Sequence, residues 1–327
     1  MQQTRQQTYP GIIDTIGAGF GIVTRRLALL LIPILVDVAL VSAPPLSFTP
    51  LLAQAVEGYK ALLQQVAANP ASGVSAEQLQ QMDDQVQELR GASKNLNLLM
   101  LVAWRVPSAA RMIEPVADQP AVQLSDWGSV AVAGLGLILG GLALATLYLG
   151  ALGQYVRQGS FKPLGYAAGL GRQGLRLLGY TLVLVAASVA IAVPTLGVIA
   201  LFMRFVPPLG AFAITMLGAV ALWAVFYLYF VDGAIFVAGA GVFPAIRQSF
   251  QTVRRHFWSA LGLILVSVII GIGTGIVWSR VVPGAFPWVL LASAGNAYIA
   301  TGLIAASFVY FRDRSAQPEP ASQSGRV

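Results

Sequence analysis

The chain contains, at residues 127–156, the run WGSVAVAGLGLILGGLALATLYLGALGQYV, which carries no charge between Asp126 and Arg157. A helix that crosses the hydrocarbon core of a bilayer needs about 20 predominantly apolar residues. Trp127 and Tyr155, near the ends of the run, are the aromatic types that are enriched at the headgroup level. The run therefore predicts a transmembrane helix from Trp127 to about Gly153.

Five other stretches are long and apolar enough to cross a membrane in the same way. The first of all six in chain order contains Pro33 and Asp37, and the fourth contains Asp232. Together they predict an all-α integral membrane bundle of about six transmembrane helices. The five run over residues 27–46, 177–203, 209–239, 258–279 and 287–311.

The composition agrees with a lipid-facing surface. The 327 residues are 57% hydrophobic and 10% charged, with a mean hydropathy of +0.73, whereas soluble domains carry about 25% charged residues. The absence of cysteine and the single histidine, His256, exclude disulfides, thiolate metal sites and motifs that need two histidines. The net charge of +7 is distributed as at a membrane surface, so we expect no nucleic-acid partner and no cofactor.

The orientation follows from lysine and arginine in the short connections, which are enriched on the cytoplasmic side. The two short connections on the other side contain Arg204 and Arg280, and the long segment 47–126 carries a net charge of −3. We therefore predict a multi-pass protein of the cell membrane with both termini in the cytoplasm. The thirteen basic residues on the cytoplasmic side are Arg5, Arg25, Arg26, Arg157, Lys162, Arg172, Arg176, Arg247, Arg254, Arg255, Arg312, Arg314 and Arg326.

The outer segment 47–126 has two amphipathic stripes joined by a turn. The first stripe runs from Leu52 to Val66, the turn is Asn69–Gly73, and the second stripe runs from Leu79 to Leu89. This pattern predicts an extracytoplasmic helical hairpin that offers a surface to a protein partner. The short apolar stretch 96–104 is expected to pack against the hairpin or to lie at the interface.

The inner connections predict interfacial helices in which Pro10, Pro163 and Pro244 each occupy the first helical position, where the missing N–H of proline costs nothing. In the third of these, residues 243–257, the phenylalanines and Ile246 form an apolar face. Arg247, Arg254 and Arg255 lie on the polar face and are candidate contacts for lipid headgroups, because cations favour anionic headgroups. Membrane lipids are therefore expected partners.

At this third helix the sequence resembles a known family. Residues 245–250, AIRQSF, followed by Arg254, Phe257 and Leu261, are similar to a signature of bacterial multi-spanning proteins related to the membrane domain of glycerophosphoryl diester phosphodiesterases. The similar part covers about thirty residues, and the 47–126 insertion departs from the family layout. The resemblance implies an inner-membrane location and this fold, and it carries over no activity because the family's hydrolytic domain is a separate soluble barrel.

Glycine patterns give no evidence for an active site. Gly169–Gly174 matches G-x-G-x-x-G but lacks the preceding strand of a dinucleotide site, and no phosphate-binding loop occurs. Gly17-x-x-x-Gly21, Gly136-x-x-x-Gly140 and Gly271-x-x-x-Gly275 are small-residue patterns. The two within spans allow close helix packing inside the molecule or between two copies, which leaves a homo-oligomer open.

Asp37 and Asp232 are the candidate intramembrane functional residues. Asp37 lies about 15 Å along the first span, where a carboxylate is costly and usually faces a partner or a water-filled cavity. One interpretation is a site linked to protons or cations. The other is a carboxyl group bonded to a hydroxyl of another span or to Arg204 or Arg280. Asp232, near the cytoplasmic end of the fourth span, is expected to reach headgroups or an arginine.

Two functional classes remain. The first is a non-enzymatic accessory, scaffold or lipid-organising membrane protein, and the second is a transporter or permease subunit for a small solute or lipid. We favour the first because transporters usually show broken helices and polar clusters at mid-membrane. The predicted units are residues 1–46 (inner amphipathic helix and first span), 47–126 (outer hairpin), 127–311 (five-span bundle) and 312–327 (disordered cytoplasmic tail).

Overall fold

The computed structural model describes residues 9–67, 97–110, 120–281 and 286–315, together with the single positions 80, 84, 87 and 91. Nearly all of the described chain is helical, which confirms the all-α prediction. The elements are α1 (Ile12–Arg25), η1 (Leu27–Leu30), α2 (Leu31–Ser42), β1 (Leu46–Ser47), α3 (Thr49–Ala67), η3 (Leu98–Leu101), β2 (Val122–Gln123), α5 (Trp127–Gln158), α6 (Pro163–Phe205), α7 (Pro207–Leu228), α8 (Val231–Phe236), α9 (Val242–Arg255), α10 (Phe257–Val281) and α11 (Phe286–Ser315).

Five helical stretches of the described chain are long and apolar enough to cross a membrane, one fewer than predicted. They are α5, α6, α7 continued by α8, α10 and α11. The predicted first span is instead the shorter apolar stretch Leu27–Ser42, about 24 Å long at 1.5 Å per residue. It ends because Ala43 is extended and precedes Pro44 and Pro45, which disfavour a continuing helix.

The ends of α5 are fixed by local capping. The Asp126 side chain accepts a hydrogen bond of 2.7 Å from the backbone N–H of Ser129, which satisfies a donor that the first turn leaves unpaired. This bond holds the pKa of Asp126 below its usual value. At the other end Gly159 adopts φ +69°, the left-handed conformation that terminates helices. α5 therefore begins where the sequence predicted and ends at Gln158 rather than near Gly153.

The core lies where α5, α8 and α11 meet. Tyr148 is buried on α5 and its hydroxyl donates to Thr301 Oγ1 at 2.9 Å. The rings of Phe230 and Tyr310 stack with centroids 4.9 Å apart. Gly153 allows the backbone of Phe236 to approach, because a Cβ at Gly153 would lie 2.8 Å from the Phe236 carbonyl oxygen. The short helix α8 is thus clamped between two long helices.

α1 packs lengthwise along α11. Thr15, Gly19 and Val23 are buried, while Ile13 is 84% exposed. A Cβ at Gly19 would lie 2.5 Å from the backbone nitrogen of Ala306 and 2.6 Å from the carbonyl oxygen of Gly302. The small residues therefore decide this contact, because they let two helix backbones meet closely.

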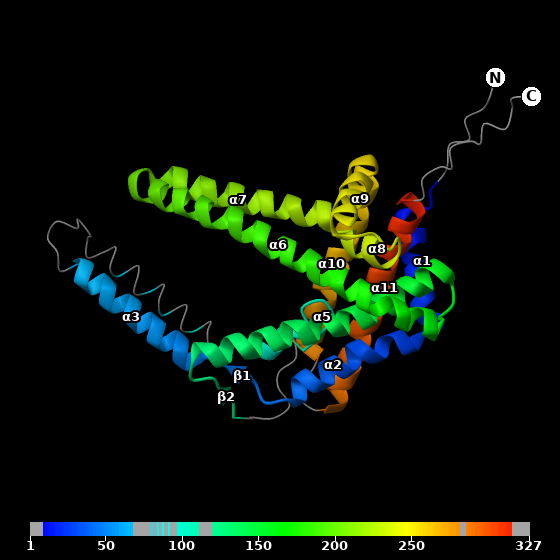
Figure 1. Ribbon diagram of the computed structural model, residues 1–327, viewed down its shortest axis with the longest axis horizontal. Coiled ribbons are helices and arrows are strands. Elements are labelled where there is room, and N and C mark those ends of the chain that lie inside the picture. The colour runs from blue at the N-terminus through cyan, green and yellow to red at the C-terminus, as the bar shows by residue number, and fades with distance from the viewer. Residues whose placement is uncertain are drawn as a thin grey trace, which may run out of the picture.

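α6 and α7 form an antiparallel pair that extends away from the remaining helices (Figure 1). α6 has 43 residues, which gives a length of about 64 Å. Of the most apolar stretch in α6, 6% is buried within the protein, against 56% in α11. The exposed side chains are apolar, so this pair offers the surface that a lipid environment requires.

α3 is the described helix of the predicted outer hairpin, and its base is closed by a short parallel pair of strands. β1 and β2 pair Leu46 with Val122 and Ser47 with Gln123. Asn97 joins the same place, because its Oδ1 accepts from the backbone nitrogens of Leu46 and Leu99, each at 3.0 Å. The predicted turn of the hairpin, most of its second stripe and residues 316–327 of the predicted tail lie outside the described residues.

α9 buries a face of small residues. Ala245, Ser249, Thr252 and Val253 are buried, whereas two phenylalanines of the predicted apolar face remain exposed. These are Phe243, with 71% of its surface accessible, and Phe250, with 45%. The predicted headgroup contacts Arg247, Arg254 and Arg255 are all exposed.

Five of the six glycines in the predicted small-residue motifs make no close helix contact. A Cβ placed on Gly17, Gly21, Gly136, Gly140 or Gly271 would meet nothing within 4 Å. Packing inside the molecule therefore does not explain these five glycines. The exposed glycines of α5 remain available to a second copy, as the sequence left open.

Candidate functional site

Asp37 lies on α2 and is completely buried. Its Oδ1 accepts a hydrogen bond of 2.5 Å from the Ser108 hydroxyl. The backbone N–H of Ala109 donates to both carboxylate oxygens at 3.0 Å, and that of Ala110 donates to Oδ1 at 3.4 Å. These hydrogen bonds come from the segment before β2 and not from an arginine. The Ser293 hydroxyl of α11 also lies beside the carboxylate, so a hydroxyl of another span is present, as one interpretation of the sequence expected.

These bonds satisfy an irregular stretch of backbone inside the bundle. Apart from the short helix η3, residues 97–110 form turns and extended chain, so the N–H groups of Ala109 and Ala110 belong to no helix or strand that would pair them. An unpaired polar backbone group in apolar surroundings costs several kcal/mol, on the order of 2–7. The carboxylate of Asp37 accepts hydrogen bonds from two such N–H groups and from the Ser108 hydroxyl. We call residues 97–110 the inserted segment.

The inserted segment reaches the middle of α5. A Cβ at Gly141 would lie 2.6 Å from the carbonyl oxygen of Val102 and 3.0 Å from that of Leu101. Gly141 is about 21 Å along α5 from Trp127 at 1.5 Å per residue. The segment therefore packs within the bundle, whereas the sequence predicted that residues 96–104 pack on the hairpin or lie at the interface.

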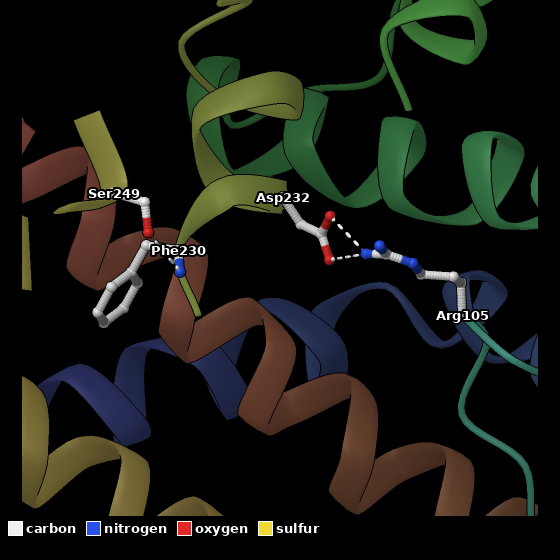
Figure 2. Close-up of polar contacts among 4 residues, drawn as sticks. All are labelled: Arg105, Phe230, Asp232 and Ser249. Atoms are coloured by element: carbon white, nitrogen blue, oxygen red, sulfur yellow. Dashed lines mark hydrogen bonds and ion pairs between the residues drawn. The ribbon is translucent and has the colours of Figure 1, made fainter. Parts of the chain in front are cut away.

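Asp232, in the first turn of α8, holds the same segment through Arg105. Figure 2 shows the guanidinium pointing at the carboxylate, with Nη1 3.0 Å from Oδ1 and 3.1 Å from Oδ2. The guanidinium also lies over two rings, 5.2 Å from the centroid of Tyr180 and 5.4 Å from that of Trp104. Asp232 was expected to meet headgroups or an arginine, and the structure provides an arginine from the predicted outer segment.

α8 is placed by a break in the predicted fourth span. The helix is interrupted between Leu228 and Val231, and Ser249 of α9 bridges the interruption. The Ser249 hydroxyl accepts from the Phe230 backbone nitrogen at 3.1 Å and donates to the Tyr227 carbonyl at 2.7 Å (Figure 2 shows the first bond). Because Ser249 satisfies both groups, the chain can turn at Phe230 and direct Asp232 toward the inserted segment.

An apolar cavity lies beside the inserted segment. It has a volume of about 400 Å³ and lies between α2, η3 and α5. Its walls include Val36 and Leu40 of α2, Leu99 and Val102 of the segment, and Leu144. All of its lining residues are apolar, so the cavity suits hydrocarbon rather than a hydrated ion.

The two candidate carboxylates do not form one polar centre. Asp37 contacts residues 108–110 and Asp232 contacts Arg105, so they bind neighbouring parts of one segment. Among the residues that the structure describes, no three side chains of histidine, cysteine, aspartate or glutamate gather as a metal site would require. Both carboxylates can therefore position the segment, each from a different helix.

His256 lies at the junction of α9 and α10. Its ring meets Tyr9 edge-on with centroids 5.1 Å apart. Burial lowers the pKa of His256 below its usual value, and the charges of Arg314 and Arg255 lower it further. The imidazole is thus neutral at neutral pH, as expected for a histidine among cations.

Sequence reasoning missed the roles of Arg105 and Ser108. The signal was present in residues 98–110, LLMLVAWRVPSAA, where Arg105 is the single charged residue of an apolar stretch. A lone arginine in such surroundings needs a partner. Its partner could not be identified because Asp232 is 127 positions away.

Comparisons of this chain with protein-family models, with curated proteins and with solved structures found no match.

Proposed function

We propose that the chain is a non-enzymatic multi-pass protein of the cell membrane, an accessory, scaffold or lipid-organising factor, and that the short stretch Leu27–Ser42 is a sixth crossing that leaves both termini in the cytoplasm. The observation that supports this proposal is that both carboxylate oxygens of Asp37 already accept hydrogen bonds from the protein itself. Its two oxygens accept four hydrogen bonds from Ser108, Ala109 and Ala110. The carboxylate is committed to holding a piece of the protein.

A transport site requires a different environment. An acid that carries protons or cations must meet water or the ion during its cycle, and Asp37 has no exposed surface. Moving the inserted segment away from Asp37 would leave the N–H groups of Ala109 and Ala110 unpaired in apolar surroundings. The second candidate acid, Asp232, is likewise engaged by Arg105. Both contacts favour a fixed segment over a moving one.

Holding the inserted segment also holds α3, the described helix of the predicted outer hairpin. Asn97, at the start of the inserted segment, binds the backbone of Leu46, and β1 pairs with β2 at the same place. α3 begins at Thr49, directly after β1. The base of α3 is thus tied to the bundle through several bonds. We propose that the predicted outer hairpin receives a protein partner there, while α6, α7 and α9 contact lipids.

The alternative is a transporter or permease subunit for a small solute or lipid. Two observations favour it. The break between α7 and α8 interrupts a membrane-length helix, and broken helices are typical of transporter binding sites. The 400 Å³ apolar cavity beside α2 could receive part of a lipid.

Flux through reconstituted protein separates the two proposals. Purified wild-type protein and Asp37→Asn are placed in vesicles that contain a trapped pH-sensitive dye, and a potassium diffusion potential is applied. A holding role predicts that both proteins leave proton and cation leakage equal to that of protein-free vesicles. Leakage by the wild type that is lost in an equally stable Asp37→Asn protein would establish transport instead.

A further inference from the structure

A second, polar cavity lies at the end of the bundle where α5 ends and α6 begins. It has a volume of about 90 Å³ and is lined by residues of α5, α6, α8 and the connection before α9. Its polar walls contain three arginines, two glutamines and a tyrosine: Arg157, Arg172, Arg176, Gln154, Gln173 and Tyr166.

Among the described residues, the three arginines have no acidic partner. Within the described chain, none of them forms an ion pair. Arg176 donates through Nη1 to the Gly239 carbonyl, which fixes its guanidinium in the cavity wall and engages one of its five N–H donors. Arg157 and Arg172 are exposed at the rim. Three clustered cations without a carboxylate form a site that an anion would neutralise.

The two glutamines supply hydrogen-bond acceptors, whereas the arginines supply donors. Gln154 is 6% exposed, and its Nε2 donates to Gln158 Oε1 at 3.4 Å and to the Lys162 carbonyl at 3.3 Å. These bonds orient the amide and leave its Oε1 buried with no partner, as is Oε1 of Gln173. A buried acceptor without a donor costs about 1–3 kcal/mol. Two such acceptors in one small cavity indicate that a donor is missing.

Gly150 allows this arrangement. A Cβ at Gly150 would lie 2.9 Å from Gln173 Oε1 and 3.2 Å from the Tyr166 ring. The Tyr166 hydroxyl donates to the Leu147 carbonyl and so holds the first turn of α6 against α5. The cavity is therefore built by close packing of the two helices.

We propose that this cavity binds the headgroup of a phospholipid that carries hydrogen-bond donors beyond its phosphate, namely phosphoglycerol or phosphoethanolamine. The arginines pair with the phosphate, and the hydroxyl or ammonium donors bond to Gln154 Oε1 and Gln173 Oε1. Basic pockets between helices at the membrane surface are typical sites for such headgroups. Leu175 and Leu182 continue along the exposed face of α6 next to Arg172 and provide apolar surface for the acyl chains.

The proposal predicts selectivity that needs no mutation to detect. Delipidated wild-type protein in detergent is titrated with dioleoyl lipids, and bound lipid is counted by native mass spectrometry. Phosphatidylglycerol and phosphatidylethanolamine should be retained about tenfold more tightly than phosphatidylcholine, whose trimethylammonium group offers no donor. Equal retention of phosphatidylcholine would overturn the assignment. Retention of glycerol phosphate without retention of any lipid would also overturn it in favour of a soluble phosphate compound.

Substitutions then separate the two halves of the site. Arg172→Gln should weaken the binding of every phospholipid about tenfold by removing a charge-assisted contact. Arg280 is an exposed arginine on α10, and Arg280→Gln, the matched control, should leave phospholipid binding unchanged. Gln173→Leu should abolish the preference over phosphatidylcholine while leaving phosphatidic acid bound. A preference that survives Gln173→Leu would contradict the role of the glutamines. Asp37 and Arg105 take no part in this site, so its test is independent of the proposed function.

Discussion

Arg105 donates through a single nitrogen, Nη1, to both carboxylate oxygens of Asp232, a residue 127 positions further along the chain. The pair joins the inserted segment to the first turn of α8. Its side chains retain 15% and 29% of their exposure, so water screens it more than a fully buried pair. The contact links the chain before β2 to the core helix that α5 and α11 enclose.

Removing one partner of this pair should destabilise the protein. Arg105→Met leaves Asp232 without its counter-ion, and we expect a loss on the order of 2–3 kcal/mol, below the 3–5 typical of fully buried pairs. Thermal or steric-trap unfolding in detergent measures the change. The double variant Arg105→Met/Asp232→Leu should recover part of it, because no unpaired charge remains. Strictly additive losses would show that the two residues do not interact.

The packing of the inserted segment on α5 can be tested at adjacent glycines. Gly141→Ala places a Cβ 2.6 Å from the Val102 carbonyl oxygen, which should cost about 1–3 kcal/mol of stability as the segment is displaced. Gly140→Ala is the matched control, since its Cβ would meet nothing within 4 Å. Its stability should stay the same or rise slightly, because alanine favours helix over glycine. Equal effects of the two substitutions would contradict the placement of the segment.

His256 should titrate below its usual pKa of about 6.5, because burial and the charges of Arg314 and Arg255 disfavour the imidazolium form. It is the single histidine of the chain, so its ring protons give one unambiguous NMR signal. The unfolded chain takes up this proton first as the pH falls. The contribution of His256 to stability is therefore complete above about pH 6.5 and is lost as the pH drops through the folded-state pKa. His256→Gln should remove this dependence below about pH 6.5, and a midpoint above 6.5 in the native protein would refute it.

The predicted orientation can be tested by labelling, because the chain contains no cysteine. A single cysteine introduced at Ser72, in the predicted outer segment, should react with a membrane-impermeant thiol reagent in intact cells. One introduced at Ser315, at the end of α11, should react only after the cells are opened. The reverse pattern would overturn the orientation inferred from the arginine distribution.

The helices could be predicted because they are long apolar runs. The site could not, because it depends on tertiary contacts that the sequence does not reveal. α5, α10 and α11 correspond to uncharged runs that lie within or near the predicted limits. The stretch 27–46 was overextended because Pro44 and Pro45 end the helix early. The span at 209–239 was expected to be continuous, and the bridge by Ser249 that allows its interruption is a tertiary contact.

The inserted segment shows why the candidate site was only half accessible to sequence reasoning. Asp37 and Asp232 could be selected because a carboxylate in an apolar run is costly. Their partners could not be selected, since residues 97–110 are too short to span a membrane and have little regular periodicity. Glycine spacing did not identify the glycine that makes the close contact on α5. Gly140 and Gly141 are adjacent and differ only in the helix face that they occupy.

Amide hydrogen exchange of the inserted segment measures whether the Asp37 carboxylate holds it in place. In wild-type protein in nanodiscs, peptides that cover residues 105–110 should be strongly protected, because Asp37 accepts the N–H groups of Ala109 and Ala110. Asp37→Ala should speed their exchange about tenfold or more while α11 remains protected. Asp126→Ala, which removes a carboxylate cap from the exposed end of α5, is the control and should leave these peptides unchanged. If residues 105–110 exchange rapidly in the wild type, or at the same rate with and without the Asp37 carboxylate, then Asp37 does not hold the segment.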